Sequence, residues 1–160
     1  MDPPFGKKWH TREDSGLRLD RQLRWWHDGE PVEHPKIIEA FNRGLEPADD
    51  GRFTLTFGRD WCFVEVEDAA YAVVALERCS SGELMIRLSA GAEEPLDPTT
   101  LEVDAEGVAT CRVKCGRAKA RFTRDAQLAL GLLIERDGGG TFLRVGEERV
   151  PLPPGLLPEG

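Results

Sequence analysis

The stretch FTLTFGRDWCFVEVEDAAYAVVAL, residues 53–76, decides the fold class. Apolar and polar side chains alternate over 53–57 and again over 61–67, which is the period of a β-strand with one buried face. Residues 71–76 are almost wholly apolar, as in a strand at the centre of a sheet. Strands that follow one another at this spacing, joined by polar turns, predict a mainly antiparallel sheet.

Further short strands are predicted on both sides of this stretch. Upstream, Leu23–His27 has strand character and ends at the turn dipeptide Asp28-Gly29. Downstream, polar or glycine-containing turns separate a series of similar segments. These predicted strands are 83–88, 101–104, 108–113, 117–122, 141–145 and 149–152.

Two helices are predicted. Pro35 suits the first position of a helix, and apolar residues on one face continue to Leu45. Thr123 can cap a second helix, which has Asp125 in its first turn, where a carboxylate is favoured by the helix dipole. Leucines occupy nearly every side of this second helix, so we expect it to be buried. On that basis Leu132→Asp is expected to cost several kcal/mol of stability.

Together these elements predict an α+β fold: mainly antiparallel β-sheet in two closely packed lobes, with one helix near residues 35–45 and a buried helix near 124–136. We find no internal repeat in the sequence. The predicted organisation is a flexible N-terminal tail at 1–19, an N-terminal α+β lobe at 20–89, a C-terminal β-rich lobe with one helix at 90–153, and a Pro-rich tail at 154–160.

Composition narrows the class of function. The 160 residues are 40% apolar and 31% charged, which is ordinary for a soluble globular protein. The 21 basic residues against 29 acidic ones give a net charge of −8, which opposes nucleic-acid binding. No apolar run approaches the roughly 20 residues of a membrane helix. Because the N-terminus, Met1 to Pro4, does not resemble a secretion signal, we expect a cytoplasmic location.

The cysteines and histidines do not have the spacing of a metal site. There is no Cys-x-x-Cys pair, and Cys111 and Cys115 would lie about 13 Å apart along a strand. The three histidines, His10, His27 and His34, all precede the cysteines. We therefore predict reduced thiols, no zinc and no cofactor. Phosphate-binding loops, nucleophile elbows and zinc-protease motifs are also missing from the sequence, which argues against an enzyme.

The charge pattern indicates a candidate binding surface. Six basic residues and no acidic ones lie between Val108 and Arg124, whereas 71–107 carries eight acidic residues and two basic ones. A row of cations on an acidic protein could hold a phosphate or another anion. In the alternative interpretation, the row pairs across the sheet with Glu102, Asp104 and Glu106 and is structural. The candidate ligand-binding residues in this row are Arg112, Lys114, Arg117, Lys119 and Arg121.

Two weaker constellations lie nearer the N-terminus. Adjacent strand residues point to opposite faces, so Trp26, next to His27, could form an exposed stacking platform, or it could cover the core. Glu65 and Glu67 lie on one strand face and could bind a cation or act as acid and base, or they could simply be solvated.

The order of several motifs resembles the bacterial family DUF1285, a domain of unknown function. The motifs are Trp25-x-His27-x-Gly29-x-Pro31-Val32, Asp50-Gly51-Arg52-Phe53-x-Leu55, Val64-x-Val66-Glu67-Asp68-Ala69 and Gly82-x-Leu84. The resemblance implies an α+β architecture and no assigned reaction. The chain departs from the family pattern in the loops Phe57–Asp60 and Ser89–Ala92.

These observations favour a non-enzymatic cytoplasmic module that binds a partner protein or a small anionic ligand, with the basic row, Trp26 and His27 as candidate contacts. The alternative is an enzyme that uses carboxylate and histidine acid–base or metal-assisted chemistry around His27, Glu65 and Glu67. Nothing in the sequence indicates a membrane partner, and nucleic acid is not expected.

Overall fold

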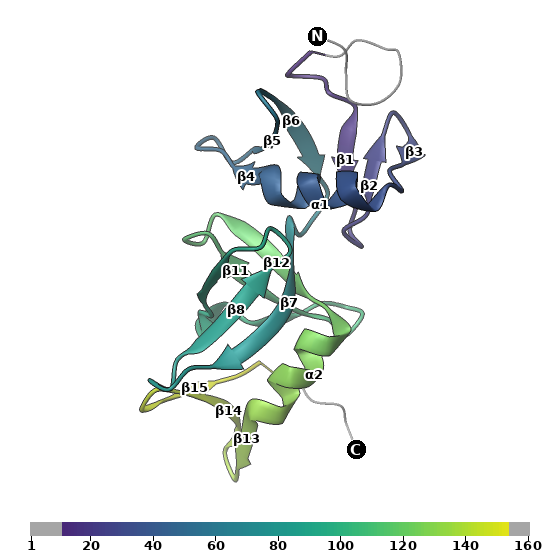
Figure 1. Ribbon diagram of the computed structural model, residues 1–160. Helices are drawn as coiled ribbons and strands as arrows, with labels where there is room; N and C mark the ends of the chain where they lie inside the picture. The colour runs from purple at the N-terminus through teal and green to yellow at the C-terminus, as the bar shows by residue number, and fades with distance from the viewer. Residues whose placement is uncertain (1–10, 154–160) are drawn as a thin grey trace. The chain divides into compact units, whose positions relative to one another are not determined.

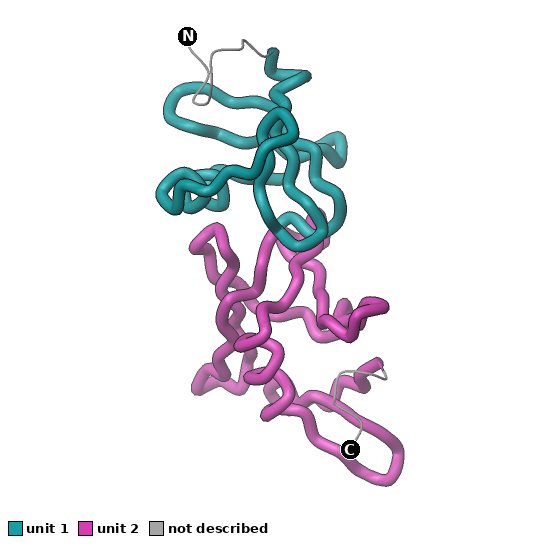
Figure 2. Tube along the Cα trace, turned by 90° about the vertical axis from the view of Figure 1, so that its right-hand side faces the viewer, with its two compact units in different colours: residues 1–70 teal, residues 71–160 magenta. Residues whose placement is uncertain are grey.

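The computed structural model describes residues 11–153, and in this part of the chain two helices accompany three β-sheets (Figure 1). The strands pair mainly in the antiparallel sense. The α+β class is therefore confirmed. The predicted Pro-rich tail at 154–160 and the first ten residues of the predicted N-terminal tail lie outside the described residues. The chain divides into two compact units, Met1–Ala70 and Tyr71–Gly160 (Figure 2).

The first unit is built from two three-stranded meanders joined by a helix. The order along the chain is β1 (Leu17–Leu19), β2 (Trp25–His27), β3 (Glu30–Pro31), α1 (Pro35–Gly44), β4 (Leu45–Pro47), β5 (Phe53–Phe57) and β6 (Asp60–Val66). Trp25 packs edge-on against Phe41 of α1, with ring centroids 5.0 Å apart. Its indole Nε1 donates a 2.9 Å hydrogen bond to Asn42 Oδ1. This contact fixes α1 against the buried face of the sheet.

The second unit begins with a long hairpin and ends with a small separate sheet. Its elements are β7 (Tyr71–Arg78), β8 (Leu84–Leu88), β9 (Glu93–Pro95), the 3-10 turn η1 (Pro98–Thr100), β10 (Glu102–Val103), β11 (Ala109–Val113), β12 (Ala118–Phe122), α2 (Arg124–Leu133), β13 (Ile134–Asp137), β14 (Gly140–Val145) and β15 (Glu148–Pro151). The core contains Val73, Ile86 and Phe122, all nearly inaccessible to solvent.

The two six-stranded sheets share one topology. The strand orders are β3-β2-β1-β6-β5-β4 and β9-β8-β7-β12-β11-β10, so each sheet joins two meanders at their first and last strands. Both junctions are parallel, β1 with β6 and β7 with β12. The sequence shows no internal repeat, but the arrangement of strands in the structure is repeated. A ten-residue helix links the meanders in one unit and a three-residue turn links them in the other, which removes any constant period from the sequence.

The boundary between the units falls between Ala70 and Tyr71, and not between residues 89 and 90 as predicted from the sequence. The reason is the parallel pairing of β7 with β12, which the local pattern of the chain does not reveal. Tyr71 lies opposite Ala120, and Val73 lies opposite Phe122. The hairpin β7–β8 therefore belongs to the same sheet as β11 and β12.

The prediction of a flexible tail over residues 1–19 is wrong for residues 11–19, the part of this segment that the structure describes. The hydroxyl of Ser15 donates a 2.6 Å hydrogen bond to the Phe63 carbonyl, and the Phe63 amide donates to the Arg12 carbonyl. Leu17 and Leu19 are buried in β1. Three residues are too few for a recognisable alternation, and the partner strand β6 is far away in sequence.

The second predicted helix is shorter and less buried than expected. It ends at Leu133, and Ile134 begins β13. Only Ala126 and Leu130 are buried, whereas Leu128 is 61% exposed and Leu132 is 87% exposed. The predicted burial on all sides is wrong because the sheet covers a single stripe of the helix. The large cost expected for Leu132→Asp therefore loses its physical basis, because this side chain already lies in solvent.

Candidate functional site

The structure brings only part of the basic row together. Arg112 on β11 lies directly opposite Lys119 on β12, and Arg121 follows on the same face of β12. Lys114 and Arg117 lie in the turn between the two strands instead. Lys114 has a left-handed backbone with φ of 54°, and its ammonium lies 5.5 Å from the Tyr71 ring centroid. The row is therefore a cluster at one end of a hairpin.

Arg121 is held by carboxylates. Its guanidinium lies 3.0 Å from Asp104 Oδ2 and 3.6 Å from Glu106 Oε2. Burial alone would raise the pKa of Asp104, but hydrogen bonds from the Val108 and Glu106 amides, together with the charges of Arg121 and Lys119, leave this pKa below its ordinary value. The structural interpretation of the row thus applies to Arg121.

Arg112 and Lys119 have a different environment. Their positive charges face each other across neighbouring strands, an arrangement that costs free energy unless a negative charge lies near both. Lys119 has a negative charge close by, since its own charge helps to lower the pKa of Asp104. Arg112 is exposed. Arg112 is therefore the cation of the basic row best placed to attract an anion, and Lys119 lies directly opposite it.

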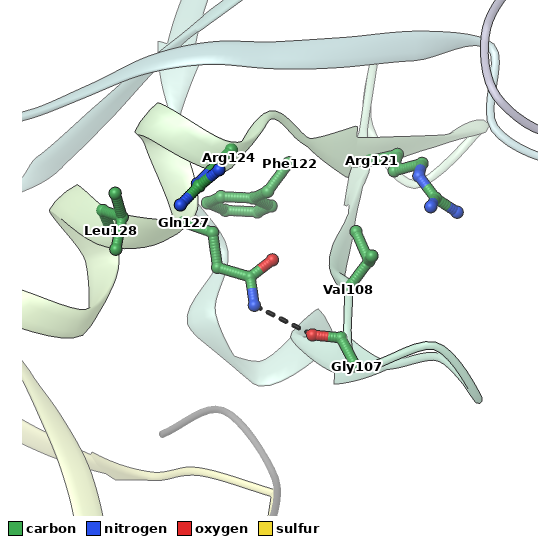
Figure 3. Close-up of a pocket in the computed structure, with 7 residues that line it drawn as sticks. All are labelled: Gly107, Val108, Arg121, Phe122, Arg124, Gln127 and Leu128. Carbon is green, nitrogen blue, oxygen red and sulfur yellow. Dashed lines mark hydrogen bonds between the residues drawn. The ribbon is translucent and has the colours of Figure 1, made fainter. Parts of the chain in front are cut away.

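A pocket of about 420 Å³ lies beside α2 in the second unit (Figure 3). Phe122, Val108 and Leu128 give it apolar walls. Gln127 closes one side, because its amide nitrogen donates a 2.9 Å hydrogen bond to the Gly107 carbonyl and its oxygen accepts one from the Ala109 amide. The other lining residues are Gly107, Arg121 and Arg124.

The orientation of the side chains limits what this pocket can do. In Figure 3 the guanidinium of Arg121 is directed away from Gln127 and Leu128. Its stem, and not its charge, therefore borders the cavity. Arg124, Gln127 and Leu128 lie on one face of α2, spaced by three and four residues. The pocket is consequently an apolar hollow that continues onto an exposed helix face.

Trp26 is not a free stacking platform. Its indole Nε1 donates a 2.9 Å hydrogen bond to Asp20 Oδ2, and the Arg18 guanidinium lies over its ring at 5.2 Å from the centroid. The neighbouring His27 points to the opposite face of the strand, where its side chain is 13% exposed and Nε2 lies 3.7 Å from Asp28 Oδ2. Trp26 is therefore a half-buried side chain held by Asp20 and Arg18.

The residues of the proposed acid–base site do not converge. Arg18 is the cross-strand neighbour of both Trp26 and Glu65, which places Glu65 on the Trp26 face of the sheet. Glu67 forms an ion pair with the Arg18 guanidinium. His27 lies on the other face, so the structure separates the histidine from both carboxylates.

Sequence reasoning missed a series of arginine–aromatic contacts on the first unit. The guanidinium of Arg12 lies 4.7 Å from the Trp61 ring centroid, and that of Arg52 lies 3.6 Å from the Phe63 ring centroid. Each arginine also pairs with a carboxylate, Arg12 with Asp60 at 3.5 Å and Arg52 with Asp50 at 2.7 Å. The alternation Trp61-x-Phe63 was the available signal. These contacts cover the face with the protein's own paired charges.

The thiols have a structural setting. Burial, with smaller contributions from the charges of Glu94 and Asp97, raises the pKa of Cys111 to about 12. Burial also raises the pKa of Cys62. Within residues 11–153 no three His, Cys, Asp or Glu side chains gather as metal ligands. Over the same residues, neither ten-residue helix is long enough to cross a membrane.

These features define a two-unit α+β protein with a repeated sheet topology. Solved structures with a similar fold include a DUF1285 family protein from Silicibacter pomeroyi DSS-3, which is 21% identical, with a TM-score of 0.66 over 88% of this chain and 80% of that one. A second is a DUF1285 family protein from Shewanella baltica OS155, which is 19% identical, with a TM-score of 0.54 over 72% of this chain and 90% of that one.

The resemblance to DUF1285 is thereby confirmed at the level of the fold. No protein-family model and no curated protein matches the sequence. The structural likeness shows the fold and carries no reaction with it.

Proposed function

We propose that the protein is a binding module of the DUF1285 family, and that a partner protein docks on the exposed face of α2 and the adjoining pocket. The observation that carries this proposal is the exposure of Leu128 and Leu132, one helical turn apart, at 61% and 87%. Large apolar side chains exposed beside an apolar hollow are typical of protein–protein interaction sites.

The fold does not require these two leucines. Ala126 and Leu130 attach α2 to the sheet, and Thr123 caps its first turn by accepting a hydrogen bond from the Ala126 amide. Leu128 borders the pocket, so an apolar side chain of the partner could enter between it and Phe122. Arg124 at the rim adds a residue type that interfaces favour.

The test is photo-crosslinking in cells, with a photoreactive amino acid placed at Leu132 or Leu128. Val74 is the matched control, because it is an exposed apolar residue of the same unit, 40% accessible, on β7. We expect a protein that crosslinks at the two helix positions and not at Val74. Its purified form should bind Leu128→Ser/Leu132→Ser at least about tenfold more weakly than the wild type. Equal crosslinking at all three positions would contradict the proposal.

A second candidate function, binding of a small anion, is supported by the facing cations Arg112 and Lys119. Phosphate titrated at low salt should shift the amide resonances of β11 and β12 near these residues, and the effect should disappear at high salt. Arg112→Gln/Lys119→Gln should abolish the shifts, whereas Lys36→Gln on α1 should retain them. Unchanged spectra at low salt would refute this site. A cytoplasmic location remains a prediction.

A further inference from the structure

Most sheet edges of this protein are protected against strand addition. Of the six edge strands within residues 11–153, four contain a proline, which lacks the amide donor that a new strand would need. A fifth edge, β10, has only two residues. The protected four are β3 with Pro31, β4 with Pro47, β9 with Pro95 and β15 with Pro151.

The exception is β13, a four-residue edge strand without proline that leaves the end of α2 directly (Figure 1). Its hairpin with β14 closes at the pair Asp137–Gly140. Because hydrogen-bonded and outward-facing residues alternate from such a closing pair, the amide and carbonyl of Arg136 point away from β14. Two residues before β13 in the chain is Leu132, the most exposed large apolar side chain of the described residues.

Charge determines what can pair with this edge. Glu135 is already paired with Arg144 at 3.3 Å, and Asp137 is paired with Arg149. Arg136 is exposed on the other face of the strand and forms no ion pair within residues 11–153. A strand placed opposite β13 therefore needs an acidic side chain beside Arg136 and uncharged ones beside Glu135 and Asp137.

A second copy of β13 does not meet this requirement. Arg136 faces outward, so two antiparallel copies would align Arg136 with Arg136 or with Ile134. The first register places Glu135 opposite Asp137, and the second places Glu135 opposite Glu135. Like charges directly opposite each other disfavour both registers.

We propose that β13 accepts an extended segment of the partner protein as a fourth antiparallel strand, with an acidic residue opposite Arg136 and apolar residues that continue toward Leu132. This inference rests on the proposed function, since the same partner covers Leu132. Backbone hydrogen bonds to Arg136 would provide affinity, and the acidic and apolar side chains would provide specificity.

The test uses a fluorescent synthetic peptide, Thr-Glu-Thr-Val-Thr-Leu, whose Glu can lie opposite Arg136 and whose Val can lie opposite Ile134. We expect binding to the full chain with slowed exchange of the Arg136 amide. Arg136→Pro, which removes an amide that the fold does not use, should weaken binding by about tenfold or more. Arg136→Gln should have a smaller effect. A peptide methylated on the Glu nitrogen tests the same pairing with the protein unchanged.

The outcomes separate this inference from the proposed function. Peptide binding could be lost in Leu132→Ser but unaffected by Arg136→Pro and by N-methylation. This result would support docking on the α2 surface and overturn strand addition. Peptide binding that is weakened by Arg136→Pro but not by Leu132→Ser would support strand addition and contradict docking on the α2 surface. Absence of binding at millimolar peptide would overturn the pairing. Self-association that Arg136→Pro abolishes would overturn the assignment to a partner, because it would identify a second copy as the occupant.

Discussion

At the scale of single residues, Asp20 organises the turn between β1 and β2. Its side chain is nearly inaccessible, and its two oxygens accept hydrogen bonds from the Gln22 and Arg24 amides, Arg24 Nε and Trp26 Nε1. Burial alone would raise the pKa of Asp20. The hydrogen bonds from Trp26, Arg24 and Gln22, together with the Arg24 charge, outweigh burial and hold this pKa below its ordinary value of 3.8.

This pKa predicts an acid-dependent loss of stability. Because the folded carboxyl has the lower pKa, its contribution is fully present above about pH 3.8 and is lost as the pH falls through the folded value. Asp20→Asn should cost about 2 kcal/mol at neutral pH, since an amide group would face donors. Its unfolding free energy should also fall less steeply below pH 4 than that of the wild type. Chemical denaturation at several pH values measures both, with exposed Glu33→Gln as control. Parallel pH curves would contradict the prediction.

At the scale of elements, the two faces of α2 differ sharply in burial. Leu130 is 1% exposed and Leu132 is 87% exposed. We predict that Leu132→Asp retains the melting temperature to within a few degrees, since the charge stays in water. Leu130→Asp should unfold the domain, since burial of an unpaired charge costs several kcal/mol. Thermal melts followed by circular dichroism distinguish the two variants, and similar losses in both would refute the observed orientation of α2.

Glycines give a second comparison between the helices. A Cβ at Gly44, the last residue of α1, would lie 2.2 Å from the Thr56 carbonyl oxygen, whereas one at Gly131 of α2 would have no neighbour within 4 Å. Gly44→Ala should therefore destabilise the protein by about 2 kcal/mol or more, because backbone atoms must move apart. Gly131→Ala should stabilise it by about 0.5–1 kcal/mol through helix propensity. Denaturant midpoints test both signs, and a neutral Gly44→Ala would contradict the close contact of α1 with β5.

Prediction of the elements from sequence succeeded where pairing partners are neighbours along the chain. The alternation over 53–57 and 61–67 corresponds to β5 and β6, and Pro35 is the first residue of α1, as predicted. Burial of α2 was wrong because the number of leucines does not tell how many faces of a helix are covered. The arginine–aromatic contacts depend on Arg12 and Arg52 approaching β6 from other segments, so strand patterns do not reveal them.

At the scale of the whole molecule, the unit boundary can be tested with fragments. Residues 71–160 keep β7 beside β12, whereas residues 90–160 lose this partner strand and the buried side chains Val73, Leu84 and Ile86. We predict a cooperative thermal transition for fragment 71–160 and none for fragment 90–160. Calorimetry gives the answer, and a cooperative transition in 90–160 would favour the boundary expected from sequence.

The two parallel junctions also predict the order in which parts of each sheet form during folding. Each joins residues roughly fifty positions apart, Arg18 with Glu65 and Tyr71 with Ala120, so each must close a long loop before its contacts compensate the lost chain entropy. The hairpins on either side close far shorter loops. In pulse-labelled hydrogen exchange during refolding, the Cys79 amide, bonded to Glu83 across a tight turn, should be protected before the Thr123 amide, bonded to Val73 across the junction. We therefore expect the same kind of late step to limit the refolding of both units.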